Sequence, residues 1–177
     1  MTIFEAIAER YSYRGSYLDI AVPREDLKKI LEAGLAAPSG CNAQTAYLIG
    51  IDEPEVLKKT SDILGKPSYA ALSAGIFVIS HAIPTYEDMY FNVQDYSAAI
   101  ENMLLAIVGL GYASCWIEGE ITADPARQKA LAELLAVPDG FAVVAFLPLG
   151  VPVSPGKRAV HKPFEERAFF NSFGRNS

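Results

Sequence analysis

The segment that decides the fold covers residues 95–110 and reads DYSAAIENMLLAIVGL. Its apolar residues recur at intervals of three and four positions, which is the spacing of an amphipathic α-helix. They are Ile100, Met103, Leu104, Ile107 and Val108. Because apolar residues occupy more than one face of this helix, we expect it to lie at the centre of the molecule with neighbours on several sides.

The chain on either side of this segment alternates between helical and strand-like patterns. Helices are predicted over about residues 2–12, 23–35, 54–64 and 125–135, and strands over 46–51, 75–81, 113–117 and 141–149. The first helix begins at Thr2, with Glu5 at the spacing of a capping box. Since no internal repeat and no linker interrupts this order, we expect residues 1–177 to form one domain.

The composition excludes several classes of protein. With 177 residues, of which 51% are hydrophobic and 20% charged, the chain can close a core without disulfides or metal. No apolar run reaches the roughly 20 residues of a spanning helix, and 15 basic against 21 acidic residues disfavour a nucleic-acid surface. Two cysteines and the absence of a signal-peptide pattern predict a cytoplasmic protein. Two histidines without a cysteine grouping give no support for a metal site.

Residues 150–177 show no sustained periodicity and are interpreted as an extended arm. The arm contains four aromatic residues, Phe164, Phe169, Phe170 and Phe173. An arm of this length loses conformational entropy on ordering, so it must lie on something. The aromatic residues either cover the chain's own core or dock on a second copy.

A basic cluster, Arg10-Tyr11-Ser12-Tyr13-Arg14, follows the first predicted helix. If the helix continues to residue 12, the two guanidinium groups lie one turn apart with a hydroxyl between them, a suitable trap for one phosphate. A surface basic turn is the alternative. Lys157 and Arg158, far away in the sequence, could complete the same trap.

Two further segments carry polar groups or glycine suited to a flat ligand. The loop 37–44 contains Ser39, Asn42 and Gln44, whose side chains can hydrogen-bond the edge of a heterocycle. The segment 115–119 ends in Glu118-Gly119, where glycine lets the backbone approach a ligand closely.

Two other patterns have less specific readings. Gly109 and Gly111 follow a helix rather than a strand, so they indicate the end of that helix and not a dinucleotide-binding turn. Cys115 is interpreted as a small packed residue, with a thiolate nucleophile as the alternative.

Together these segments resemble the nitroreductase family of flavin enzymes. The family's basic-x-Ser-x-basic motif is matched by Arg10, Ser12 and Arg14, its Pro-Ser-x-x-Asn-x-Gln loop by Pro38, Ser39, Asn42 and Gln44, its late turn by Glu118 and Gly119, and its closing basic pair by Lys157 and Arg158. The order and the intervals of these motifs fit over nearly the whole chain. Thr45 departs from the family, many of whose members have proline there.

The resemblance implies a fold, an assembly and a cofactor. The implied fold is an α+β three-layer sandwich, a mostly antiparallel sheet flanked by helices, and the implied assembly is a homodimer with FMN at the subunit interface. The basic cluster and the closing pair would hold the phosphate, the Pro38 loop would come from the partner subunit, and the Glu118–Gly119 turn would present its backbone to the flavin N5 edge. Tyr11, Trp116 and Ile117 are included in the implied cofactor site. Lys66, His161 and Lys162 remain open as further contributors.

The implied activity is ping-pong hydride transfer from NAD(P)H to FMN and on to a nitroaromatic, a quinone or a related small acceptor, with no catalytic side chain required. Two alternatives from other classes remain: a flavin-binding or sensing protein without turnover, and a cysteine hydrolase that uses Cys115.

Overall fold

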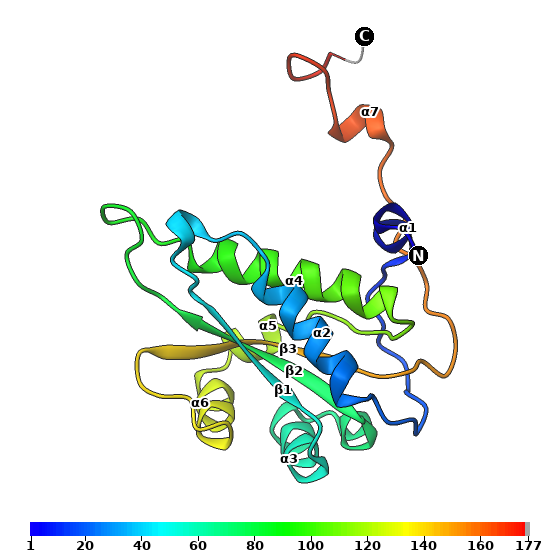
Figure 1. Cartoon of the computed structure of the whole chain (residues 1–177), viewed down its shortest axis with the longest axis vertical. Coiled ribbons are helices and arrows are strands. Elements are labelled where there is room, and N and C mark those ends of the chain that lie inside the picture. The colour runs from blue at the N-terminus through cyan, green and yellow to red at the C-terminus, as the bar shows by residue number, and fades with distance from the viewer. Residues whose placement is uncertain (176–177) are drawn as a thin grey trace.

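The computed structural model describes residues 1–175 of the chain (Figure 1). Its helices are α1 (Ile3–Glu9), α2 (Arg24–Leu35), α3 (Pro54–Leu64), α4 (Asn92–Gly109), α5 (Gly119–Thr122), α6 (Pro125–Leu134) and α7 (Phe164–Arg167), with 3-10 turns η1 (Gly40–Asn42) and η2 (Pro67–Ala71). Its strands are β1 (Ala46–Ile51), β2 (Ala74–His81) and β3 (Phe141–Leu149).

The strands form an antiparallel sheet in which β2 lies between β1 and β3. A β-bulge interrupts the pairing of β2 with β3, because Val78 pairs with Ala145 whereas Ile79 pairs with Val143. Val144 is the additional residue of this bulge. It places Val144 and Ala145 together on one face of the sheet and Val143 on the other.

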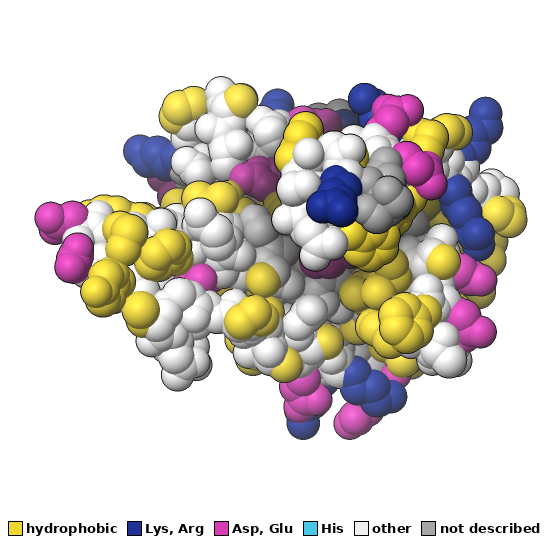
Figure 2. Space-filling model, turned by 90° about the horizontal axis from the view of Figure 1, so that it is seen from above, with side chains coloured by type: hydrophobic (Ala, Val, Ile, Leu, Met, Phe, Trp, Pro, Cys, Tyr) yellow, Lys and Arg dark blue, Asp and Glu magenta, His cyan; other side chains and the backbone are white. Residues whose placement is uncertain are grey.

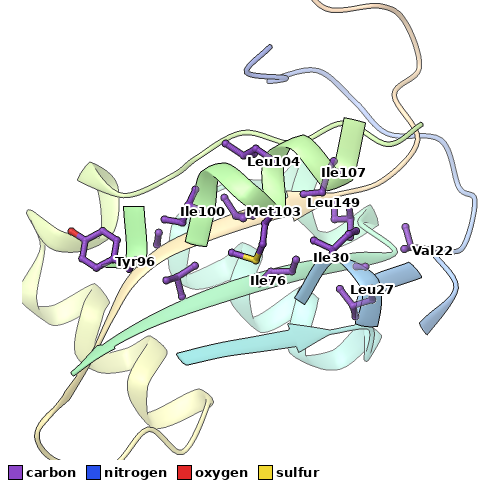
Figure 3. Packing of buried hydrophobic residues seen from close by; sticks show 14 of the residues in the cluster. Val22, Leu27, Ile30, Ile76, Tyr96, Ile100, Met103, Leu104, Ile107 and Leu149 are labelled. Carbon is purple, nitrogen blue, oxygen red and sulfur yellow. The ribbon is translucent and has the colours of Figure 1, made fainter. Parts of the chain in front are cut away.

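The first core lies between the sheet and helices α2 and α4 (Figure 3). Ile30 of α2 and Ile100, Met103 and Ile107 of α4 have no exposed surface. Helix α4 contacts α1, α2, β1 and β2. The prediction that this helix is central is therefore confirmed.

The second core lies on the opposite face of the sheet, against α3, α5 and α6. At its centre the rings of Phe77 and Phe146, from β2 and β3, have centroids 4.6 Å apart. Leu57, Ile121 and Leu131 bring the three helices onto these rings. Helices on both faces of an antiparallel sheet make the expected α+β three-layer sandwich.

Local sequence signals set most element boundaries. Thr2 and Glu5 form the expected capping box of α1, and Asp124 accepts hydrogen bonds from the first amides of α6. After α4, the Gly111 amide bonds to the Val108 carbonyl at 3.0 Å, so the glycines do end that helix.

Three predicted elements differ from the structure. Helix α1 stops at Glu9 instead of residue 12, because Arg10 takes an extended conformation with φ −60° and ψ 133°. Residues 113–117 make single β-bridges to Gly150 and Phe146 in place of a continuous strand. The apolar run 46–51 also predicts a buried strand, but β1 is half-buried because it lies at the edge of the sheet.

The first residues of the C-terminal arm pair with residues 16–18, and beyond α1 the arm extends away from the layered body (Figure 1). Its aromatic rings contact one another, with centroids 5.9 Å apart for Phe164 and Phe170 and 4.8 Å apart for Phe169 and Phe173. Phe173 is 95% exposed, and the four rings belong to neither core. The structure therefore does not place the arm over the chain's own core.

Helix α1 also exposes apolar side chains. Ile3, Phe4 and Ile7 are each more than half exposed, and of this helix only Ala6 is buried. Figure 2 shows hydrophobic side chains spread over the face seen from above. Among residues 1–175, no helix is both long enough and apolar enough to traverse a lipid bilayer.

The close approach of β2 to β3 generates a prediction about stability. A Cβ added at Gly75 would lie 2.5 Å from the ring of Phe146, so Gly75→Ala is expected to destabilise the protein by about 1–3 kcal/mol through overpacking. The control is Gly109→Ala, whose added Cβ meets no described atom within 4 Å. Urea unfolding should give a lower midpoint for Gly75→Ala alone, and equal midpoints would contradict the packing described here.

Candidate functional site

A pocket of about 520 Å³ opens between η2 and the segment that leads into α5. It is lined by Arg14, Lys66, Ser68, Tyr69 and residues 115–120, and we call it the cationic pocket. The structure thus brings together Arg14 and the predicted residues Trp116, Ile117, Glu118 and Gly119. The volume lies in the range of small-molecule sites.

Backbone hydrogen bonds hold the pocket wall in place. The amide of Ile117 donates to the carbonyl of Phe146 at 3.1 Å, and the reverse bond measures 2.8 Å. On the other side the amide of Tyr13 donates to the carbonyl of Ser114 at 2.8 Å. The segment 113–117 is therefore fixed between β3 and the chain that follows α1.

Side chains of this segment alternate between the two cores. Cys115 and Ile117 pack in the second core, whereas Trp116 packs against the first. The indole of Trp116 is therefore held by the first core.

The basic cluster is extended, which corrects the expectation of two arginines one helical turn apart. Tyr13 is buried, and its bond to Ser114 keeps the chain from continuing α1. In an extended segment alternate residues share a face, so Arg10, Ser12 and Arg14 still lie on one side.

Of these three residues only Arg14 lines the cationic pocket. Arg10 pairs with Glu101 of α4 at 3.4 Å. Ser12 forms a parallel bridge with Ser114.

The lining of the cationic pocket carries two cations, the carboxylates of Glu118 and Glu120, and one thiol. Burial raises the pKa of the Cys115 thiol, while Arg14 and Lys66 act in the opposite direction and Glu120 adds to the rise. A thiol with a raised pKa is a poor nucleophile at neutral pH. This is evidence against the hydrolase alternative, and it supports the interpretation of Cys115 as a packed residue.

The structure also gives Lys66, left open by the sequence, a place in the site. Its ammonium group pairs with Glu120 at 2.9 Å within the lining of the cationic pocket. Next to Glu120 in the chain, an added Cβ at Gly119 would meet no described atom within 4 Å. A ligand can therefore approach the backbone of this turn closely.

Tyr96 orients the side chain of Glu118 in the Glu118–Gly119 turn. Its hydroxyl donates to Glu118 Oε1 at 2.7 Å, and the tyrosine itself is buried on α4. Burial, followed by the neighbouring Glu118 carboxylate, raises the pKa of Tyr96 well above its ordinary value. The neutral hydroxyl is thus the stable donor across the physiological range.

The loop with Pro38, Ser39 and Gln44 borders a different pocket, of about 470 Å³, which also includes Tyr47 and Asp95. Asn42, at the end of η1, is exposed. Within one chain the structure does not bring this loop to the cationic pocket.

The closing basic pair lies beside the first basic cluster. Gly156 packs against the ring of Tyr11, and Arg158 pairs with Glu9 at 3.7 Å. Lys162 makes a local pair with Glu166 at 3.7 Å within the arm, and His161 is exposed. The two basic segments, separated by more than a hundred positions in the sequence, are therefore neighbours in space.

Several residues of the site carry no motif in the sequence. Ser68 and Tyr69 line the cationic pocket, and Asp95 and Tyr96 hold ligand-directed segments from α4. The sequence offered one usable signal, which is that Asp95 and Tyr96 are polar residues at the start of a helix whose other faces are apolar.

Comparisons with known proteins find matches over most of the chain. The model of the Nitroreductase family matches residues 7–67 and 52–151. A protein of Archaeoglobus fulgidus named as an NADH dehydrogenase/NAD(P)H nitroreductase is 37% identical over 139 residues, which is 77% of this chain and 78% of that protein.

Solved structures share the fold of this chain. An FMN-dependent nitroreductase from Clostridium difficile superposes with a TM-score of 0.77 at 28% identity, covering 96% of this chain and 99% of that one. An NADH dehydrogenase/NAD(P)H nitroreductase from Parabacteroides distasonis superposes with a TM-score of 0.82 at 24% identity, covering 97% and 98%.

The hydrogen bond from Tyr96 generates a prediction about alkaline stability. Tyr96→Phe is expected to lower the free energy of unfolding by about 1 kcal/mol at pH 7. Above about pH 10 the unfolded wild type loses this proton before the folded state does, so wild-type stability falls with pH and the gap to the variant narrows. Urea unfolding from pH 7 to 11 measures the gap, with Tyr86→Phe, at an exposed hydroxyl, as the control. A gap that stays constant with pH would contradict the role given to Tyr96.

Proposed function

The chain belongs to the nitroreductase family, and on that premise we propose that it is an FMN-dependent oxidoreductase that uses NAD(P)H to reduce a small electron acceptor. The acceptor class is nitroaromatic compounds, quinones or related molecules. The supporting observation is the cationic pocket, whose lining combines Arg14 and Lys66 with the open Glu118–Gly119 turn.

The residues of this pocket fit FMN by their chemistry. A phosphate needs charge-assisted donors, and guanidinium groups provide these in forked geometry. A flavin ring needs backbone that can be approached closely, which the turn at Gly119 provides. The glycines that could suggest a second phosphate-binding turn, Gly109 and Gly111, lie at the end of α4 instead, and this favours FMN over FAD.

We assign the phosphate to Arg10, Ser12 and Arg14 together with Lys157 and Arg158. Tyr11 supports this group through its contact with Gly156. The ion pairs of Arg10 with Glu101 and of Arg158 with Glu9 hold these side chains ready on the surface. The ring lies against the backbone of 116–119, with Lys66 as the cation beside it.

Bound FMN supplies the chemistry, which is hydride uptake from a nicotinamide followed by reduction of an acceptor at the same site. The chain contributes binding, orientation and charge. Arg14 and Lys66 supply positive charge beside the carboxylates of Glu118 and Glu120. Tyr96 orients the half-buried Glu118 side chain by its hydrogen bond.

The proposal includes a homodimer in which Pro38, Ser39, Asn42 and Gln44 complete the partner's site. Two observations support it. The loop lies outside its own chain's cationic pocket, and the arm and α1 expose apolar side chains that a second copy could cover. A two-fold axis would place each arm on the other subunit.

The absorption spectrum tests the proposed function. The purified protein is expected to show flavin bands that disappear under anaerobic NAD(P)H and return on addition of a quinone, and mass analysis of the released cofactor should identify FMN. Bands that NAD(P)H does not bleach would favour a flavin-binding protein without turnover, and a protein with no affinity for FMN would overturn the proposal.

Loss of the pocket guanidinium should weaken FMN binding. Hydrogen bonds to charged groups contribute about 1.5–3 kcal/mol, so Arg14→Ala is expected to raise the FMN dissociation constant by about tenfold to a hundredfold. Arg24→Ala, which removes an exposed guanidinium paired with Asp52, is the matched control. Quenching of flavin fluorescence measures both, and equal affinities would remove Arg14 from the site.

The arm should hold the dimer and the cofactor together. Truncation after Val160 removes the four aromatic residues of the arm. As the protein is diluted, the truncated dimer is expected to dissociate and to release FMN over the same range of protein concentration. Light scattering with flavin fluorescence follows both events, and Lys129→Ala in the full chain, which removes an exposed lysine of α6 paired with Glu133, is the control. A monomeric truncate that still binds FMN would show that one chain builds the site.

A further inference from the structure

The loop between α2 and β1 has an unusual backbone. Cys41, Asn42 and Gln44 have positive φ angles of 50°, 56° and 50°, in the left-handed region that residues other than glycine rarely adopt. We call residues 39–44 the left-handed loop. Strained backbone of this kind persists only where surrounding groups determine it, and it concentrates at functional sites.

No large buried side chain anchors this loop. Cys41, Asn42 and Gln44 are all exposed. Inside the loop, the Gln44 amide donates to Ser39 Oγ at 3.0 Å and the Ala43 amide to the Gly40 carbonyl at 2.9 Å. These bonds close the loop on itself but do not attach it to the body.

The attachment comes from Asp95 in the first turn of α4. Its carboxylate is buried, with 4% of the residue exposed. Oδ1 accepts from the Gly40 amide at 2.8 Å and Oδ2 from Thr45 Oγ1 at 2.6 Å, so one side chain grips both ends of the loop. Both donors, the Gly40 amide and the Thr45 hydroxyl, are neutral. The N-terminal end of α4 interacts favourably with the carboxylate.

Packing reinforces this grip. A Cβ at Gly40 would lie 2.6 Å from Phe91, the residue that precedes α4, so the loop rests directly on that ring. Tyr96, the residue after Asp95 in α4, donates its hydroxyl hydrogen to Glu118 in the cationic pocket. One turn of α4 therefore orients both the left-handed loop and the Glu118–Gly119 turn.

We propose that Asp95 is a positioning residue, which with Thr45 holds the left-handed loop in the shape that presents Asn42 and Gln44 to the flavin ring of the partner subunit. Asp95 acts through the loop and does not touch the ring. This inference rests on the proposed function for the identity of the ligand, whereas the grip itself is a property of the chain alone.

Hydrogen exchange on the protein without flavin tests the grip. In Asp95→Ala the amides of Gly40, Ala43 and Gln44 are expected to exchange at least about tenfold faster, although only the first of them bonds to Asp95. Asp95→Asn retains an acceptor for Gly40 and should restore most of the protection. Asp52→Asn removes a carboxylate that pairs with Arg24 away from the loop, and it should leave these amides unchanged.

The flavin-loaded protein tests the consequence. At saturating FMN, Asp95→Ala is expected to shift the absorption maxima and the reduction potential of the bound flavin and to raise the KM for the acceptor more than it lowers kcat. Thr45→Val, which replaces the hydroxyl by a methyl group on the same branched side chain, should give a smaller shift of the same sign. It replaces Asp95→Ala if that variant does not fold.

The outcomes separate the two proposals. A wild type that binds no flavin overturns the proposed function, and with it the role toward the ring, while faster exchange in Asp95→Ala would still show the grip. A wild type that binds flavin, together with variants whose exchange, spectrum, potential and KM match it, overturns the role of Asp95. Faster amide exchange together with an unchanged flavin spectrum, reduction potential and KM would also overturn it, because the loop would then not act on the ring.

Discussion

Burial of α4 against α2 and one face of the sheet is the constraint on which the rest of the structure depends. Ile100, Met103 and Ile107 have no exposed surface, and burying such side chains stabilises the fold by about 1.5–3 kcal/mol each. A helix fixed this firmly is a rigid reference at both ends. Its first turn carries Asp95 and Tyr96, and its last turn directs the chain into the segment 113–117 that forms the pocket wall.

The pocket wall shows how little regular structure a site needs once its neighbours are rigid. Residues 113–117 form no continuous strand, yet bonds to Phe146 on one side and to Tyr13 on the other fix their direction. Alternation then sends Cys115 and Ile117 into the second core and Trp116 toward the first. The backbone left facing outward is what a flat ligand would meet at Gly119.

The sequence predicted those parts of the fold that local periodicity and capping determine. The strand at 46–51, the strand at 141–149 and the central helix followed from spacing alone. The end of α1 did not, because the bond from Tyr13 to Ser114 joins positions about a hundred apart and overrides the helical pattern. For the same reason the motifs indicated Arg14 and Glu118 but not Asp95, whose partners Gly40 and Thr45 lie 55 and 50 positions away and form no pattern.

The left-handed loop connects stability to the proposed function. Three non-glycine residues with positive φ cost on the order of 1 kcal/mol each or more, and an exposed loop gains nothing for its own core from that shape. An ordinary helix-to-strand loop could relax to avoid this cost. Here α4 supplies a buried carboxylate that holds the loop in the strained shape. The strain lowers the stability of the chain, and the resulting shape leaves Asn42 and Gln44 facing outward. A ligand bound in another subunit would explain this loss of stability, because the loop borders no part of its own cationic pocket.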